Sequence, residues 1–108
     1  MSHFYDLEQM DSKDLVDGVT LQTVWGERIM LSRVVIEPGA EVPLHDHPHE
    51  QAGTLLEGLM EMTIGDETRE LTPGDSYVIP GGVMHSARAV GGRVVVLDLF
   101  SPPREEYK

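Results

Sequence analysis

The chain has no cysteine, and it has few basic residues. Without thiols it forms no disulfide framework, no thiolate metal site and no cysteine nucleophile. Its 8 Lys and Arg stand against 19 Asp and Glu, which gives a formal net charge of −11. Such a charge repels phosphate backbones and anionic lipids, so we expect neither a nucleic-acid nor a membrane partner. An anionic substrate remains compatible with this charge, because a metal ion in a pocket reverses the local field.

Long apolar runs are also missing. The longest, Val94 to Leu97, is far shorter than the roughly 20 residues that a membrane-spanning helix needs. The N-terminus shows neither the basic stretch nor the apolar segment of a signal peptide. From 108 residues of ordinary globular composition, we expect a single cytoplasmic domain.

Glycine and proline interrupt the sequence at short intervals from Thr20 onward. The segments between them are rich in Val, Ile, Thr, Leu and Met, which is typical of short strands joined by turns. We therefore predict an all-β barrel over residues 20–104, preceded by an N-terminal arm (1–19) and followed by a tail (105–108). The expected strands are Leu21–Trp25, Ile29–Ile36, Gly53–Glu57, Leu59–Ile64, Thr68–Leu71, Ser76–Ile79, Ser86–Val90 and Arg93–Phe100.

The last expected strand is apolar on both faces, so a second layer should cover its outer side, for example a partner subunit in a homodimer. Strand side chains alternate between faces, which places Asp98 and Phe100 on the same side as Val94 and Val96. An aspartate in such a strand is costly to bury unless it is paired or used. Two interpretations remain open for Asp98: a hydrogen-bonded structural acid, or a proton donor and acceptor facing a cavity.

Three other residues are candidates for the wall or mouth of this cavity. The Pro102-Pro103 turn can bring Arg104 back over the mouth, where its planar guanidinium would bind a carboxylate through two hydrogen bonds. An exposed arginine in the tail is the alternative. Met30 and Tyr77 are further candidates for the substrate pocket, although packing alone also explains large side chains of this kind.

Three of the five histidines lie within residues 45–49. On an extended segment His45 and His47 project to the same side, so both imidazoles can bind one ion. Gln51 can add an amide oxygen. His85 follows the Pro-Gly-Gly turn at residues 80–82, which can begin a strand that faces the first pair. These four side chains are the candidate metal ligands.

Neutral imidazoles and an amide suit one borderline divalent ion such as Zn, Ni or Fe(II). The set contains no thiolate and leaves coordination positions open, which is typical of a catalytic or substrate-binding metal. The alternative for His45 and His47 is a surface pair that binds nothing. We expect His49 to lie outside the ligand set and His3 to belong to the arm.

Two stretches of the sequence resemble the two motifs of the cupins. The first is Gly39-Ala-Glu-Val-Pro-Leu-His45-Asp-His47-Pro-His-Glu-Gln51 with Gly58, and the second is Gly74-Asp-Ser-Tyr-Val-Ile-Pro80-Gly-Gly82-Val-Met-His85. The resemblance implies a double-stranded β-helix, or jelly-roll barrel, with a metal ion in its mouth, and frequently a homodimer.

The sequence departs from the cupin pattern at two positions. Gln51 stands where the family usually has a glutamate, and Ala89 where it usually has an asparagine. A neutral ligand in place of an anionic one leaves the metal centre more positive, which favours anionic substrates and Lewis-acid chemistry.

The C-terminal stretch Asp98-Leu-Phe100-Ser-Pro-Pro-Arg104 narrows this resemblance. Together with the histidine motif, it is similar to the KdgF-type cupins of pectin and alginate degradation, which convert 4,5-unsaturated monouronates to open-chain keto sugars. The resemblance covers about residues 39–104. It implies His45, His47, Gln51 and His85 as metal ligands, and Asp98, Phe100 and Arg104 as pocket residues around the sugar.

The leading hypothesis is a metal-dependent isomerase that converts an unsaturated or cyclic uronate-type sugar to its linear keto form. In it, Asp98 is the acid and base and Arg104 binds the carboxylate. A non-haem metal dioxygenase acting on a small organic substrate is one alternative, and it would consume oxygen. A non-catalytic module that binds a sugar or a metal is another, and it would bind its ligand without turnover.

Overall fold

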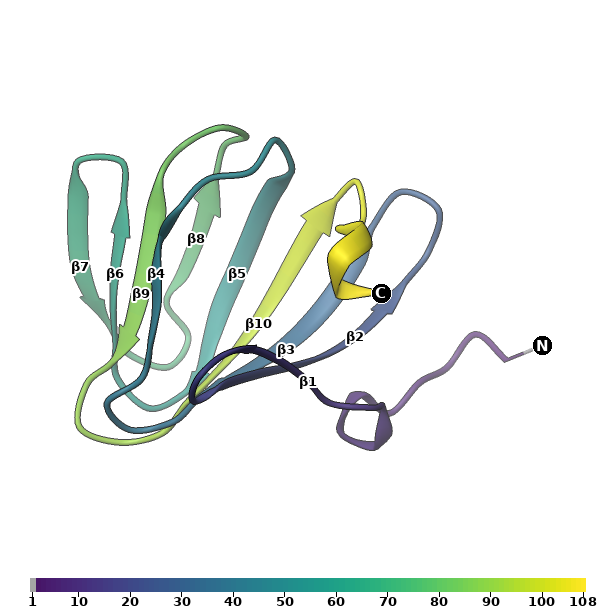
Figure 1. The fold of residues 1–108 in the computed structure, drawn as a ribbon, viewed down its shortest axis with the longest axis horizontal. Helices are drawn as coiled ribbons and strands as arrows, with labels where there is room; N and C mark the ends of the chain where they lie inside the picture. Colours follow the sequence, from purple (N-terminus) through teal and green to yellow (C-terminus); the bar gives the residue numbers. More distant parts are fainter. Residues whose placement is uncertain (1) are drawn as a thin grey trace.

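The computed structural model describes residues 2–108, and two antiparallel sheets that face each other dominate it (Figure 1). The larger sheet has the strand order β1-β2-β3-β10-β5-β8, and the smaller has β4-β9-β6-β7. The strands are β1 (Lys13–Val16), β2 (Val19–Trp25), β3 (Met30–Ile36), β4 (Glu41–His45), β5 (Glu50–Glu57), β6 (Met60–Ile64), β7 (Glu67–Leu71), β8 (Ser76–Ile79), β9 (His85–Ala89) and β10 (Val94–Ser101). Two short 3₁₀ helices, η1 (Leu7–Gln9) and η2 (Glu105–Tyr107), lie near the ends of the chain. The prediction of an all-β barrel is confirmed.

Helical structure is limited to single turns over residues 2–108, and no helix there has the length and apolarity to cross a membrane. The barrel is instead held by its strand pairing and by an apolar interior to which both sheets contribute. Alternate residues of the central strands point inward, as expected for a half-buried sheet. The core cluster comprises Val19, Leu21, Met30, Val34, Ile36, Leu55, Met60, Met62, Ile79, Ala89, Val94, Val96, Phe100 and Tyr107.

One row across the larger sheet is unusual because its inward-facing residues are polar or small. In register from β2 to β8, this row consists of Thr23, Ser32, Asp98, Gly53 and Tyr77. Thr23, Ser32 and Asp98 are all buried. The sheet thus places one carboxyl group inside the barrel, beside buried hydroxyl groups.

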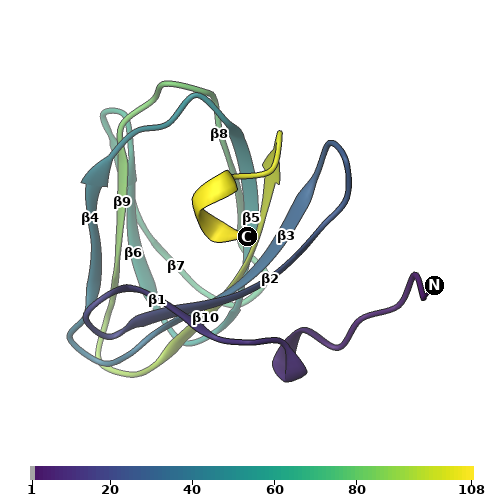
Figure 2. The ribbon, with the colours of Figure 1, turned by 45° about the vertical axis from the view of Figure 1, so that its right-hand side comes forward.

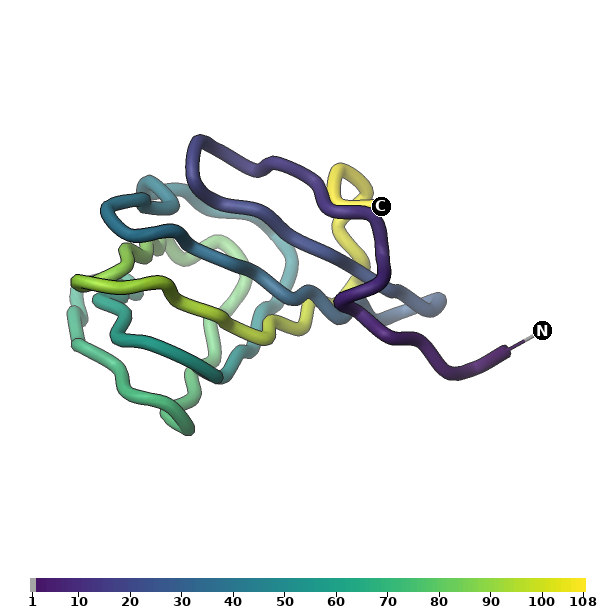
Figure 3. Tube along the Cα trace, turned by 90° about the horizontal axis from the view of Figure 1, so that it is seen from below, coloured from purple at the N-terminus to yellow at the C-terminus, as the bar shows by residue number. Residues whose placement is uncertain are grey.

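The N-terminal segment is more ordered than its composition indicates. Residues 13–16, within the arm expected over residues 1–19, form β1, which pairs with β2. The strand is hard to recognise in the sequence because acidic residues surround it and it has only four residues. Residues before η1 extend away from the barrel (Figure 3), and Met1 lies outside the described part of the chain.

The C-terminal tail folds back toward the barrel instead of leaving it. Figure 2 shows η2 in the opening between the two sheets. Tyr107 is buried, and its carbonyl oxygen accepts a hydrogen bond of 2.8 Å from the Thr23 hydroxyl. The tail expected at residues 105–108 therefore covers the opening of the barrel.

Strand β4 was not predicted from the sequence, because it contains a proline. Pro43 lies within this strand and has no N–H to donate to a neighbouring strand. The register of β4 against β9 shifts between Val42 and His45, on either side of the proline. The strand nevertheless continues to His45, which places the first candidate ligand directly opposite His85.

The outer face of the larger sheet carries a row of apolar side chains. In register, Val24, Leu31, Leu99, Ala52 and Val78 lie side by side, and Val78 is 62% exposed.

The homodimer predicted from the sequence would cover this row of apolar side chains. Light scattering should therefore give twice the monomer mass, and Leu99→Glu should reduce it to the monomer, because a charge cannot be buried unpaired in such an interface. A wild-type protein that is monomeric at high concentration would contradict the prediction.

Candidate metal centre and its cavity

Three imidazoles meet at one end of the barrel. His45 ends β4 and His85 begins β9, while His47 lies in the turn after β4. One ring nitrogen from each histidine lies within 4.8 Å of the other two. His47 and His85 are buried. The predicted cluster is present, but the segment that carries it is not extended throughout, because the turn rather than strand alternation brings His47 beside His45.

A second turn stabilises the position of His47. The Gly82 amide donates a hydrogen bond of 2.8 Å to the His47 carbonyl oxygen. A β-carbon at Gly81 would overlap with the carbonyl oxygen of Pro48. Only glycine permits so close an approach of two backbones. The Pro-Gly-Gly turn therefore binds the histidine turn to the start of β9.

Backbone carbonyl groups set the tautomer of all three rings. Nδ1 of His45, His47 and His85 lies 2.9, 3.0 and 2.9 Å, respectively, from a carbonyl oxygen two residues along the chain. A carbonyl oxygen only accepts hydrogen bonds, so each Nδ1 carries the proton and donates. The lone pair of each neutral ring is then on Nε2, which is the arrangement that metal-binding histidines adopt.

Gln51 completes the donor set. Its Oε1 lies 3.0 Å from Nε2 of His47, and its side chain is buried. Burial and the charge of Arg104 lower the pKa of His47, and burial lowers the pKa of His85, so both rings favour the neutral form. With Nδ1 of His47 donating, Nε2 of His47 and Oε1 of Gln51 are two acceptors that face each other.

A cation bound between these two acceptors would remove their mutual repulsion. Nε2 of His85 is also buried and has no hydrogen-bond partner within the protein. Buried polar atoms are rarely left unsatisfied, so a lone pair directed into this cluster indicates a ligand. Three imidazole nitrogens and one amide oxygen suit a divalent ion such as Zn, Ni or Fe(II). The residues present therefore fit a metal centre.

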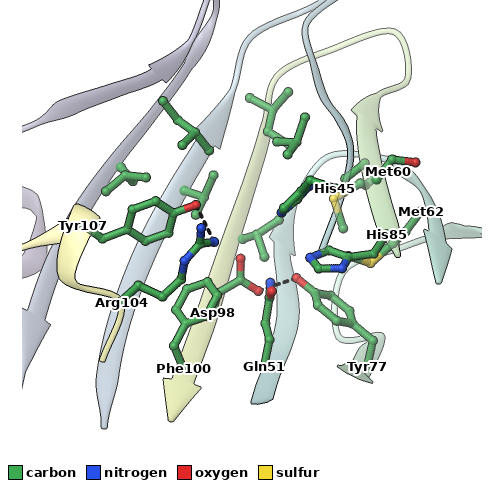
Figure 4. A pocket seen from close by; sticks show the side chains of 18 residues that line it. His45, Gln51, Met60, Met62, Tyr77, His85, Asp98, Phe100, Arg104 and Tyr107 are labelled. Atoms are coloured by element: carbon green, nitrogen blue, oxygen red, sulfur yellow. Dashed lines mark hydrogen bonds between the residues drawn. The ribbon is translucent and has the colours of Figure 1, made fainter. Parts of the chain in front are cut away.

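A cavity between the sheets is lined by two of the three histidines, His45 and His85 (Figure 4). Its apolar end reaches into the core and includes Met60 and Met62. Its polar end is lined by His45, Gln51, Tyr77, His85, Asp98, Phe100, Arg104 and Tyr107. Of the residues expected in the substrate pocket, Tyr77 and Phe100 line this cavity, whereas Met30 is fully buried in the core and is not among the lining residues.

Asp98 is the buried carboxyl group of the cavity. It is 7% exposed, and its Oδ1 accepts a hydrogen bond of 2.5 Å from the Tyr77 hydroxyl. Burial raises the pKa of Asp98 to about 6, although hydrogen bonds from Tyr77 and Gln51 oppose this change. Burial and the nearby Asp98 also raise the pKa of Tyr77 well above its ordinary value. Asp98 is thus a hydrogen-bonded acid that also faces the cavity.

Gly53 makes room for this carboxyl–hydroxyl pair. It lies on β5 between Asp98 on β10 and Tyr77 on β8, in the same row of the sheet. A β-carbon at residue 53 would overlap with Oδ1 of Asp98 and the hydroxyl of Tyr77. The missing side chain therefore lets Tyr77 reach across β5 to Asp98.

Gly53→Ala is expected to destabilise the protein by about 1–3 kcal/mol, because the new methyl group must displace buried side chains. Chemical denaturation gives the change in the free energy of unfolding. Gly92→Ala is the matched control, since a β-carbon there meets no atom within 4 Å. Equal stability of the two variants would contradict the close packing described here.

Arg104 lies at the cavity rather than in solvent. Its side chain is 11% exposed, its Nη1 donates a hydrogen bond of 2.8 Å to the Tyr107 hydroxyl, and its Nε lies 2.7 Å from a carboxylate oxygen of Glu106. The guanidinium carbon is 4.1 Å from the centroid of the Tyr107 ring and 5.5 Å from that of Phe100. Tyr107 was not among the residues predicted from the sequence, where its signal is one aromatic residue in an otherwise charged tail.

Comparison with known proteins places this architecture in a family. The cupin domain family matches residues 32–100, which is more than half of the chain. The chain belongs to the cupin family. This cupin is 28% identical to the pectin degradation protein KdgF of Dickeya dadantii, over 99% of both chains.

Solved structures agree with this assignment. The cupin is similar to KdgF from a Halomonas species, with a TM-score of 0.91 and 31% identity over the full length of both chains. It is equally similar to an RmlC-like cupin from Shewanella frigidimarina, with a TM-score of 0.91 and 29% identity over 100% of this chain and 97% of the other. The predicted double-stranded β-helix and the resemblance to KdgF are confirmed. The fold and the three-histidine cluster together make this a metal-binding cupin.

Proposed function

We propose that this cupin converts an unsaturated or cyclic uronate-type sugar to its linear keto form, at a divalent metal ion bound by the three histidines and Gln51. The observation that carries the proposal is one cavity that joins three of these donors, His45, Gln51 and His85, to the buried carboxyl group of Asp98 and the guanidinium group of Arg104. The fourth donor, His47, clusters with the other two histidines. Full-length similarity to two KdgF proteins, one of them named for pectin degradation, supports an acidic sugar as the substrate class.

The proposed reaction is an isomerisation without net oxidation. The anomeric hydroxyl loses its proton, and the bond between C1 and the ring oxygen breaks, which leaves an aldehyde at C1 and an enolate at C5. A proton added to C4 then converts the enolate to a ketone. One proton is removed and one is returned, so no further reactant is needed. A bound divalent metal supplies Lewis-acid stabilisation of negative charge on the substrate oxygens.

The protein's own groups divide the remaining work. Asp98 takes the proton of the anomeric hydroxyl and returns a proton to C4, and its pKa of about 6 suits exchange near neutral pH. Arg104 binds the sugar carboxylate, because its planar guanidinium matches two carboxylate oxygens. The ring of Phe100 packs beside Arg104 and excludes water from the pair.

The C-terminal segment controls access in this proposal. The cavity has a volume of about 50 Å³, which is room for a few water molecules but not for a sugar. Arg104 and Tyr107 line it from the segment that lies in the opening of the barrel (Figure 2). Residues 104–107 therefore move outward to admit the substrate, and Arg104 returns to bind the carboxylate.

The direct test follows the ultraviolet absorbance of the conjugated enol ether in an unsaturated monouronate. Metal-loaded protein should accelerate the loss of this absorbance above the rate in buffer that contains the same metal. The rate should be unchanged in anaerobic buffer, because the reaction uses no oxygen. Saturable binding without acceleration would favour a non-catalytic module, and a requirement for oxygen would favour a dioxygenase; either result contradicts the proposal.

Arg104→Gln is expected to raise the KM for the uronate about 10- to 100-fold, because a charged hydrogen-bond pair contributes roughly 1.5–3 kcal/mol. Steady-state kinetics at saturating metal measures the change. Arg88→Gln is the matched control, since Arg88 pairs with Glu61 at an exposed position. Equal KM values for wild type and Arg104→Gln would exclude the carboxylate-binding role.

A further inference from the structure

On the basis of the metal centre in the proposed function, we propose that Asp98 and Tyr77 are positioning residues for the metal ligand Gln51 and thereby set metal affinity. The three side chains form a chain of contacts on the inner face of the larger sheet. Figure 4 shows the end of the Gln51 side chain beside the Asp98 carboxyl group, with Tyr77 on its other side. This role is separate from proton transfer to the substrate.

Strand register brings the three groups together. Asp98 on β10 and Tyr77 on β8 flank Gly53 in one row of the sheet. Gln51 precedes Gly53 by two residues on β5, so it faces the same side and is the diagonal neighbour of both. Because Gly53 has no side chain, the Asp98 carboxyl group and the Tyr77 hydroxyl fill the space that its β-carbon would take. Asp98 accepts a hydrogen bond from Tyr77, and the amide end of Gln51 lies beside its carboxyl group (Figure 4).

The donor and acceptor roles determine which end of the amide faces the metal. An ionised carboxylate only accepts, so the atom that Gln51 directs at Asp98 is the donor Nε2. The acceptor Oε1 of Gln51 then points toward the histidines, and it lies 3.0 Å from Nε2 of His47. The opposite rotamer would turn an N–H group toward the cation. Asp98 therefore stabilises the one amide orientation that can bind a metal.

Tyr77 acts one step further away. Its hydroxyl donates to Oδ1 of Asp98 and restricts the orientation of the carboxylate. Removal of a residue that orients a metal ligand typically lowers the metal affinity about 10- to 100-fold. Both residues should therefore affect binding of the metal in the absence of any substrate.

The experiment measures binding of Zn²⁺ alone to the full chain after removal of bound metal with a chelator, by competition with a chromogenic chelator. Asp98→Ala should weaken Zn²⁺ binding about 10- to 100-fold. Asp98→Asn retains an acceptor oxygen for Tyr77 and Gln51, so it should recover most of this loss. Tyr77→Phe should also weaken Zn²⁺ binding.

Tyr107→Phe is the matched control, because it removes a hydroxyl from the same cavity that bonds to Arg104 rather than to Asp98. Its Zn²⁺ affinity should equal that of the wild type. If Asp98→Ala and Tyr77→Phe remain folded, as judged by thermal unfolding, and bind Zn²⁺ as tightly as the wild type, the inference is wrong. If Asp98→Ala does not fold, Tyr77→Phe decides.

The outcomes separate this inference from the proposed function. Wild-type protein that isomerises the uronate, with variants of unchanged Zn²⁺ affinity, would overturn the inference and leave the function intact. Reduced Zn²⁺ affinity in both variants without any isomerase activity in the wild type would support the positioning role and contradict the substrate. Wild-type protein that binds no divalent metal would overturn both.

Discussion

Asp98→Asn is expected to lower kcat about 10²- to 10⁴-fold, because it removes the proposed proton-transferring group and keeps its shape. Asparagine still accepts the hydrogen bond from Tyr77, so the cavity should keep its geometry. Stopped-flow or steady-state absorbance assays at saturating metal measure the loss. Zn²⁺ affinity measured in parallel distinguishes lost proton transfer from lost metal.

The result that would contradict this role is a fully active Asp98→Asn variant. Asp98 would then be a structural acid, and proton transfer would have to come from another group. Asp66→Asn serves as the control for a change in net charge, because Asp66 lies exposed in the turn between β6 and β7. We expect its kinetics to match those of the wild type.

His85→Ala is expected to abolish metal binding and, with it, activity. The variant removes one of three imidazole donors, and the smaller side chain leaves no substitute ligand at this buried position. His49→Ala is the matched control: His49 is adjacent in sequence to the ligands but lies outside the cluster, and its backbone carbonyl still accepts from His47. Inductively coupled plasma mass spectrometry measures the metal content per chain, which should fall in His85→Ala and stay unchanged in His49→Ala. A His85→Ala protein with one metal ion per chain would show that the three histidines are not the site.

Much of the site could be predicted because strand alternation determines which side chains face inward. The sequence placed Asp98 and Phe100 on one face of the last strand, and both line the cavity. The alternation of side chains predicts which residues of a strand face the interior. It does not predict which of those interior positions border the cavity. Met30 shows this limit: it faces inward directly opposite Phe100, yet it is buried in the core one strand away.

The parts that the sequence did not reveal depend on contacts between distant segments. Tyr107 becomes a lining residue only because the chain turns back after β10, and its backbone is tied to Thr23 on β2. Gly53 could be recognised as a spacer only once β5 was known to lie between β8 and β10. Local patterns carry no information on such pairings, since they are set by the register of strands far apart in the chain.

A crystal structure of the protein purified without added metal, with anomalous diffraction recorded, tests the central claim most directly. We predict one metal ion bound to Nε2 of His45, His47 and His85 and to Oε1 of Gln51, at about 2.0–2.2 Å. Fluorescence from the crystal would identify the element. An absence of anomalous density among the three rings, even after soaking with Zn²⁺, or a metal bound elsewhere, would contradict the account.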